Sequence, residues 1–268
     1  MSDSSANTFL LKHEFLIRRI HSLLGVVPLG LYMVVHLVTN ASLMAGPGTF
    51  QRAVNQIHSL GPALFFVEWG AIFLPLLFHA IVGVWIAMSG KSNTDQYPYT
   101  SNRRYTFQRI TGYFAFIYIT MHVFHLHGWF HFTLWLDYIA EPLGGAQFKP
   151  YNAASTLALA IDGFFWPLFY LVGVLSCVYH FANGLWTAGI TWGLWVKPAA
   201  QQRATYACSA LGFGVGLISL VAWTATLTTD PMAARKVEDR MYEVGVEAGI
   251  VYEDQHKRSY HTDSTEED

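Results

Sequence analysis

Charged residues are scarce in this chain: they make up 13% of its 268 residues, about half the share in an ordinary soluble domain. Cysteine is almost missing, and the two present, Cys177 and Cys208, exclude a disulfide framework and a zinc cluster. The net charge is only −2 and no stripe of basic residues occurs, which excludes a protein that binds nucleic acid. A disordered chain is excluded as well, because 53% of the residues are hydrophobic.

Long apolar runs make up most of the chain, and its mean hydropathy is +0.29. A helix needs about 20 mostly apolar residues to span the hydrocarbon of a bilayer. Five runs reach that length, at about 20–44, 62–88, 110–136, 157–187 and 204–227. Helices satisfy their own backbone hydrogen bonds in lipid. We therefore expect an all-α integral membrane protein, with five transmembrane helices in an antiparallel bundle over residues 20–227.

Positive charges collect in alternate connections. The segment before the first span and the connections from the second span to the third and from the fourth to the fifth carry Lys12, Arg18, Arg19, Lys91, Arg103, Arg104, Arg109, Lys197 and Arg203. The other connections carry only Arg52 and Lys149. The positive-inside rule then predicts that residues 1–19 are cytoplasmic and that the C-terminus lies outside. Because residues 1–14 are polar, we expect an uncleaved N-terminus and a first span that stays as a permanent anchor.

The C-terminal extension, residues 228–268, has a different composition. It is polar, mixed in charge, and ends in an acidic run. Such a segment is expected to be flexible or to lie on the surface, because it has too few apolar residues to form a core. His256 and His261 lie in it and are expected to be solvated.

Histidine is abundant, with twelve residues against sixteen lysines and arginines. One lies well inside each of the first four spans: His36, His79, His122 and His180. An ionisable group at membrane depth is costly and needs a partner or a function. At 1.5 Å of rise per residue, His79 and His180 lie about 14 and 10 Å from the cytoplasmic ends of their spans, and His36 and His122 about 24 and 18 Å. The four histidines thus form a shallow pair and a deep pair.

The second and fourth spans share a local pattern. Both contain His-x-x-x-Gly-x-Trp, which begins at His79 and at His180. The first and third spans in turn both begin on Arg-Ile, at Arg19 and Arg109. Spans that run in the same direction therefore resemble each other, as in a weak internal repeat.

Two histidines at one depth on different helices indicate bis-histidine ligation of a haem, with the flat porphyrin between the helices. Two such pairs predict two b-type haems stacked across the membrane, because no Cys-x-x-Cys-His string for thioether attachment is present. Gly83 and Gly184, one turn after their histidines, either leave room for the macrocycle or allow close helix packing.

Several strings resemble a known family, the five-span, di-haem cytochrome b subunit of succinate:menaquinone oxidoreductase, which is the membrane anchor of respiratory complex II. The resemblance runs through most of residues 14–226. The strings are Arg18-Arg-Ile-His21-Ser-Leu-Leu-Gly25, Val35-His36-Leu-Val-Thr-Asn40, Phe73-Leu-Pro-Leu-Leu-Phe-His79-Ala-Ile-Val-Gly83, Gln108-Arg-Ile-Thr-Gly112, Met121-His122-Val and Leu171-Val-Gly-Val-Leu-Ser-Cys-Val-Tyr-His180-Phe-Ala-Asn-Gly184-Leu-Trp186.

The resemblance implies a role for each pair of histidines. His79 and His180 would ligate the iron of the inner haem b, and His36 and His122 that of the outer one. It also implies partners in a bacterial cytoplasmic membrane: an FAD-containing flavoprotein subunit that holds the succinate site, and an iron–sulfur subunit that passes electrons to the inner haem. The outer haem would serve a quinone, and the di-haem type implies menaquinone.

Other residues carry weaker expectations. Arg19 and Arg109 are expected either to contact haem propionates or to act only as topological charge. His21 also matches a family histidine, and we expect it to be structural or to lie near a propionate. Quinone chemistry needs a proton carrier near the outer face, for which Glu68 is the first candidate. Asp162 is the only other acid within the spans.

The crowded run His122–His131 and the extension 228–268 depart from the family pattern. The roles of His125, His127 and His131 stay open between quinone protonation and an interfacial network. Two alternative functions also remain: a cytochrome b subunit of a hydrogenase or formate dehydrogenase, and a proton transporter lined by histidines. The sequence does not decide between succinate oxidation and fumarate reduction, nor the oligomeric state of the complex.

Overall fold

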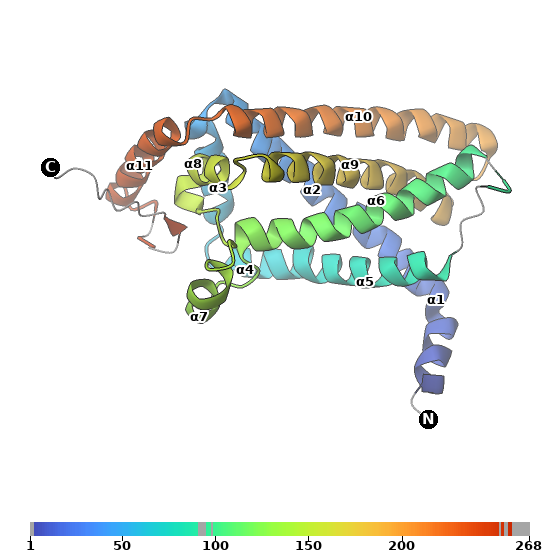
Figure 1. Cartoon of the computed structure of the whole chain (residues 1–268). Coiled ribbons are helices and arrows are strands. Elements are labelled where there is room, and N and C mark those ends of the chain that lie inside the picture. Colours follow the sequence, from blue (N-terminus) through green and yellow to red (C-terminus); the bar gives the residue numbers. More distant parts are fainter. Residues whose placement is uncertain (1–2, 91–94, 98, 252, 255–256, 259–268) are drawn as a thin grey trace. The chain divides into compact units, whose positions relative to one another are not determined.

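The computed structural model describes residues 3–90, 95–97, 99–251, 253–254 and 257–258, and these form helices and no β-strand (Figure 1). The chain divides into two compact units. The first unit consists of Met1–Leu37, Pro62–Ile117 and Val172–Ile218. The second unit consists of Val38–Gly61, Tyr118–Leu171 and Ser219–Asp268. Each unit is described by itself below.

Four helical segments are long and apolar enough to cross a membrane: Lys12–Ala45, Ala63–Ser89, Phe165–Thr191 and Pro198–Thr228. The first contains α1 (Asp3–Val26), α2 (Pro28–Ala41) and the 3₁₀ turn η1 (Ser42–Ala45). The next contains α4 (Ala63–Val67), the π-helical turn η2 (Glu68–Phe73) and α5 (Leu74–Ser89). The last two are α9 (Phe165–Thr191) and α10 (Pro198–Thr228). The expectation of an all-helical integral membrane protein is thus confirmed.

The third expected span, 110–136, ends earlier than predicted. Its helix, α6 (Thr100–His122), is followed by the π-helical turn η3 (Val123–His127) and then by Gly128, whose φ of 80° closes the turn. Two short helical pieces follow, α7 (Thr133–Trp135) and η4 (Leu136–Ala140). The apolar run continues past the helix because aromatic residues occupy the loop as well. α6 is not among the four segments above, so five spans remain a prediction.

The fourth expected span, 157–187, begins later than predicted. The short helix α8 (Ala153–Ala160), preceded by the 3₁₀ turn η5 (Pro150–Asn152), holds the first of these residues, and α9 holds the rest. Between the two helices Gly163 adopts a φ of 79°, a left-handed conformation that glycine takes without steric cost. Hydropathy averaged over a span does not detect this single turn.

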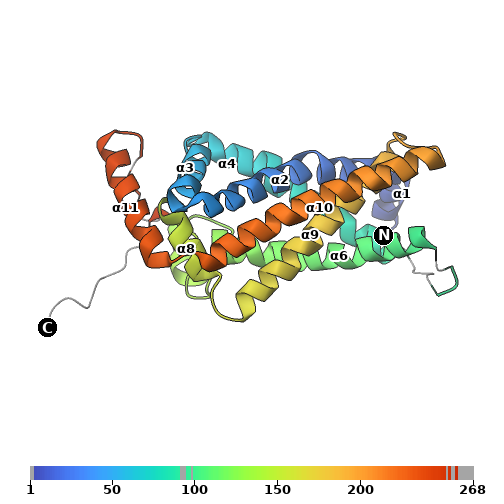
Figure 2. The same ribbon diagram turned by 90° about the horizontal axis from the view of Figure 1, so that it is seen from above.

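The C-terminal extension was expected to be flexible or to lie on the surface, and the first of these alternatives does not hold for its helix. α11 (Pro231–Glu247) begins on Pro231, and Asp230 caps it by accepting hydrogen bonds from the N–H groups of Met232 and Ala233. Ala234 and Glu238, one turn apart, are fully buried. They face α3 (Pro47–His58) and α8, which pack with α11 in the second unit (Figures 1 and 2). His256 and His261 lie outside the described residues.

In the first unit, α1 packs along α5 (Figure 1). A small apolar core lies elsewhere in the unit, where Leu37, Val178 and Val215 meet. Few large side chains of this unit are fully buried, as expected for helices that face lipid.

Candidate functional site

The shallow pair of histidines comes together in the first unit. His79 on α5 and His180 on α9 have ring centroids 6.1 Å apart, with their planes at 90°. Each Nδ1 lies against a backbone carbonyl of a neighbouring helix: that of His21 at 3.0 Å for His79, and that of Gln108 at 3.1 Å for His180. A carbonyl only accepts, so each Nδ1 carries the hydrogen and each Nε2 has a lone pair that can bind a metal, and the amide nitrogen of Gln108 also lies 3.4 Å from Nε2 of His180.

This arrangement fits one haem iron. Imidazole nitrogens bind transition metals at about 2 Å, so two rings on opposite sides of one metal have centroids about 6 Å apart. Within the described ranges, no group of three or more histidine, cysteine, aspartate or glutamate side chains is arranged to hold a metal ion. A haem needs only two protein ligands, because its porphyrin supplies the remaining four.

Glycines let the two rings lie against the neighbouring backbones. A Cβ added to Gly25 of α1 would lie 2.5 Å from Cε1 of His79, and one added to Gly112 of α6 would lie 3.0 Å from Cε1 of His180. Any side chain at Gly25 would displace the His79 ring, and one at Gly112 would crowd that of His180. These two glycines therefore set the position of the histidines.

Residues of α1 and α6 also contact the two histidines through their side chains. His21 stacks on His79 with ring centroids 4.1 Å apart, and its backbone carbonyl accepts from Nδ1 of His79. Gln108 Nε2 donates to the carbonyl of His180 at 3.0 Å, and Gln108 Oε1 accepts from Asn183 at 2.7 Å. We call each arrangement a clamp: His21 with His79 on α1 and α5, and Gln108 with His180 on α6 and α9.

The clamps also explain why glycine occupies positions 83 and 184. A Cβ on Gly83 would lie 3.2 Å from the His21 ring, and one on Gly184 would lie 3.3 Å from Nε2 of Gln108. Of the two roles expected for these glycines, the structure supports close helix packing. Sequence analysis missed Gln108 as a partner of His180, although the spacings His21-x-x-x-Gly25 and Gln108-x-x-x-Gly112 repeat the His-x-x-x-Gly pattern of the other spans.

The deep pair falls in different units. His36 on α2 belongs to the first unit and His122 at the end of α6 to the second. Each has a tyrosine one turn earlier, Tyr32 and Tyr118, whose ring centroid lies 5.5 Å from the imidazole at an angle of 28° in both cases. The two histidines thus share a local environment, Tyr-x-x-x-His, that sequence analysis did not single out.

The two predicted propionate arginines contact helix ends. Arg19 donates to the carbonyl of Thr191 at 3.2 Å, at the end of α9. Arg109 donates to the carbonyls of Ala87 and Gly90, the latter at 2.8 Å, at the end of α5. A cation is favourable there, because the last carbonyls of a helix carry partial negative charge. The role toward a haem propionate stays a prediction.

The two acids of the expected spans lie in different surroundings. Glu68 is half-buried at the start of the π-helical turn η2, close enough to Tyr32 for the two side chains to interact electrostatically. Asp162 is exposed in the turn between α8 and α9. Of the two acids, Glu68 is therefore the one that is partly shielded from its surroundings.

Four further histidines that the structure describes, His58, His125, His127 and His131, belong to the second unit. His125 is buried, stacks on Trp166 with centroids 3.8 Å apart, and hydrogen-bonds the Tyr170 hydroxyl at 3.0 Å. His127 and His131 have centroids 4.1 Å apart. Burial, helped by the charges of Lys257 and His131, lowers the pKa of His58 on α3 to about 4. These histidines and their partners form a polar network in the second unit.

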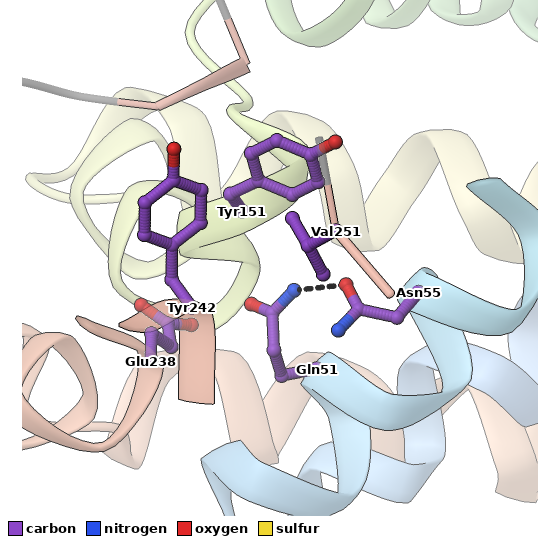
Figure 3. Close-up of a pocket in the computed structure, with 6 residues that line it drawn as sticks. All are labelled: Gln51, Asn55, Tyr151, Glu238, Tyr242 and Val251. Atoms are coloured by element: carbon purple, nitrogen blue, oxygen red, sulfur yellow. Dashed lines mark hydrogen bonds between the residues drawn. The ribbon is translucent and has the colours of Figure 1, made fainter. Parts of the chain in front are cut away.

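A second polar centre, which sequence analysis did not foresee, lies among α3, α8 and α11 (Figure 3). The buried carboxylate of Glu238 accepts hydrogen bonds from the N–H of Ala154 and from the hydroxyl of Ser155, each at 2.5 Å. Gln51, which is also buried, accepts from the N–H of Ala153 and donates to the carbonyl of Pro150. The two side chains thus cap the N-terminus of α8 from α11 and α3.

Comparison with known proteins identifies a relative of the chain. No family model matches the chain. The chain is 37% identical over 209 residues to the succinate dehydrogenase cytochrome b558 subunit of Bacillus subtilis (strain 168), a match that covers 78% of this chain and 95% of that protein. About a fifth of the present chain therefore lies outside the matched residues.

Proposed function

The chain belongs to the family of succinate dehydrogenase cytochrome b subunits, and we propose that it relays electrons between an iron–sulfur subunit and a quinone through two haems b. It would do so as the quinone-reactive membrane anchor of a complex II whose succinate site lies on an FAD-containing flavoprotein subunit. The relative is a succinate dehydrogenase subunit, which argues against a hydrogenase or formate dehydrogenase partner and against a proton transporter.

The shallow pair carries the proposal. A haem held between His79 and His180 would accept and release one electron at its iron. The residues around it keep the two ligands in place: the carbonyls of His21 and Gln108 orient the rings, and Gly25 and Gly112 leave room for them. Rings held in this way change little between redox states, which keeps the reorganisation energy small.

We assign the outer haem to His36 and His122. What supports this assignment is their common environment, since both stack on a tyrosine one turn earlier with the same distance and angle. Glu68 is the proposed proton carrier for the quinone, which we take to be menaquinone, because it is half-buried whereas Asp162, the other acid of the expected spans, is exposed. A half-buried carboxylate is suited to passing protons toward a carbonyl in lipid.

The proposal includes an orientation of the chain in a bacterial cytoplasmic membrane. The cation-rich connections would face the cytoplasm, with the flavoprotein and iron–sulfur subunits docked on that side. Five spans would then leave the C-terminal extension outside, with α6 as the third of them.

A visible spectrum tests the proposal. The purified chain should give a reduced-minus-oxidised spectrum with b-type bands and two haems per chain. His180→Leu should remove one haem and leave the other, whereas the matched control His131→Leu, which changes an exposed histidine outside both pairs, should retain both. A chain that binds no haem, or a His180→Leu variant that retains two, would refute the assignment.

A further inference from the structure

An apolar groove runs along α11 in the second unit, on the part of the chain that follows the last expected span. It has a volume of about 660 Å³, within the range of sites that hold small molecules. Val237, Met241, Val244 and Ile250 line it, and Lys236 and Arg240 stand at its edge. No carboxylate is among its lining residues within the described ranges.

The position of α11 brings this groove to a membrane surface. α10, a candidate membrane span, ends at Thr228, and α11 begins at Pro231. The two residues between them reach no further than about 10 Å even when extended. Figures 1 and 2 both show α11 turning across the end of α10 rather than continuing it. The helix therefore starts at the level of the lipid headgroups.

The groove is exposed to its surroundings. Val244 and Ile250 are 58% and 78% exposed, although apolar side chains in contact with water are unfavourable. At an interface the acyl chains of lipids cover such side chains. The opposite face of α11 is already occupied, because Ala234 and Glu238 are buried against α3 and α8.

The two cations at the groove edge have no acidic partner among the residues that the structure describes. The ion pairs of α11 join Arg235 and Arg258 to Asp239, and the carboxylate of Glu238 is bonded to Ser155. Lys236 and Arg240 lie one turn apart and are exposed. Glu243 and Glu247 lie further along the helix but do not line the groove.

We propose that this groove binds an anionic phospholipid of the surrounding bilayer, with an acyl chain along Val237, Met241 and Val244 and the phosphate between Lys236 and Arg240. The lipid would hold α11 flat on the membrane and thereby stabilise its contact with α3 and α8. Each cation near a membrane surface contributes about fivefold in preference for an anionic lipid. The inference does not depend on haem binding.

Fluorescence quenching tests it on the full chain in lipid vesicles. Cys177 and Cys208 are buried, so a fluorophore attaches selectively to a Met232→Cys variant, whose side chain is exposed on α11 outside the groove. Phosphatidylglycerol or phosphatidylcholine with brominated acyl chains is then added at equal mole fraction to phosphatidylcholine vesicles. We expect preferential quenching by phosphatidylglycerol, which falls about fivefold for Lys236→Gln or Arg240→Gln alone and disappears when both are changed.

The matched control is Arg52→Gln, because Arg52 is an exposed cation of the same unit that does not line the groove. It should leave the preference unchanged. Equal quenching by the two lipids would overturn the proposal, since it shows contact with the membrane without recognition of the headgroup. Absence of quenching together with cross-linking between two labelled chains would overturn it in favour of a second copy as the occupant.

Discussion

Gln108 and His180 hold each other across two helices: the side-chain amide of Gln108 donates to the backbone carbonyl of His180, and the ring of His180 donates to the backbone carbonyl of Gln108. Neither contact depends on sequence neighbours, because the residues are 72 positions apart. The pair fixes both the height of α6 against α9 and the direction in which the His180 ring faces. It makes Gln108 a positioning residue for a predicted ligand.

Replacing Gln108 by leucine keeps the volume of the side chain and removes both its hydrogen bonds. We expect Gln108→Leu to weaken binding of the inner haem about 10-fold or more, since partners that orient a ligand contribute that much to metal sites. Transfer of haem to apomyoglobin measures the effect. Ser176→Ala is the control, because the Ser176 hydroxyl bonds only to the carbonyl of Val172 within its own helix. Equal haem loss in both variants would contradict the clamp.

His21 occupies in its clamp the place that Gln108 occupies in the other. We therefore expect His21→Gln to retain two haems per chain, as glutamine reaches a backbone carbonyl from the same position. His21→Leu should release the inner haem more readily, because His79 loses its stacked neighbour. The haem-to-protein ratio of the two variants measures how much haem each retains. Loss of one haem in His21→Gln would instead make His21 a ligand.

At Gly25, a change as small as one added methyl group should disturb the His79 ring. In Gly25→Ala the new methyl group would lie 2.5 Å from the His79 ring, so the ring must move. Overpacking of this kind costs about 1–3 kcal/mol. We expect a lower content of the inner haem in the visible spectrum. Gly214→Ala has nothing within 4 Å of the added Cβ and should be neutral.

Glu238 makes the packing of α11 dependent on pH. Burial raises its pKa, although the hydrogen bonds from Ser155 and Ala154 oppose the shift. A raised native pKa means that the packed state binds more protons than the open state. Its contribution is therefore fully present below the ordinary glutamate pKa of about 4.3 and is lost as the pH rises through the raised value.

Hydrogen exchange of α11, expressed relative to an unfolded peptide at each pH, measures this dependence. Protection should decrease with pH in the native chain and stay level in Glu238→Gln. Asp239 does not interfere: burial acts to raise its pKa, but hydrogen bonds from Arg258 and Asn152 lower it overall, so its titration lies below the ordinary aspartate value. Glu238→Leu should reduce protection at every pH, by about 1–3 kcal/mol for each donor left unpaired. If the protection of α11 decreases with pH as steeply in Glu238→Gln as in the native chain, another group causes the pH dependence.

The sequence was sufficient to predict a fold of apolar helices of membrane-spanning length and the proximity of His79 to His180, whereas their role as ligands stays a prediction. Both follow from patterns within single helices, namely apolar length and depth along the helix axis. The predicted end of the third span and the predicted start of the fourth span were wrong. Gly128 and Gly163 adopt left-handed conformations there, and such a glycine interrupts a helix without changing its hydropathy. The clamp partner Gln108 was not predicted, since only packing of α6 against α9 brings its amide to His180.

The buried residues of the extension were not predicted, for a related reason. Its polar composition indicated a segment that cannot form a core by itself, and this holds. Glu238 and Ala234 are nevertheless buried, because α3 and α8 supply the rest of the core. Composition describes what a segment can do alone and does not reveal that a distant helix offers unpaired N–H groups to a carboxylate.

The capping of α8 by Glu238 also sets an order of assembly. Ser155 and Glu238 are 83 residues apart, with α9 and α10 between them. The N-terminus of α8 therefore has no carboxylate cap until both of those helices have been synthesised and inserted. The second unit is therefore completed only after α9 and α10 have been made, so a premature stop before residue 238 leaves α8 without this cap.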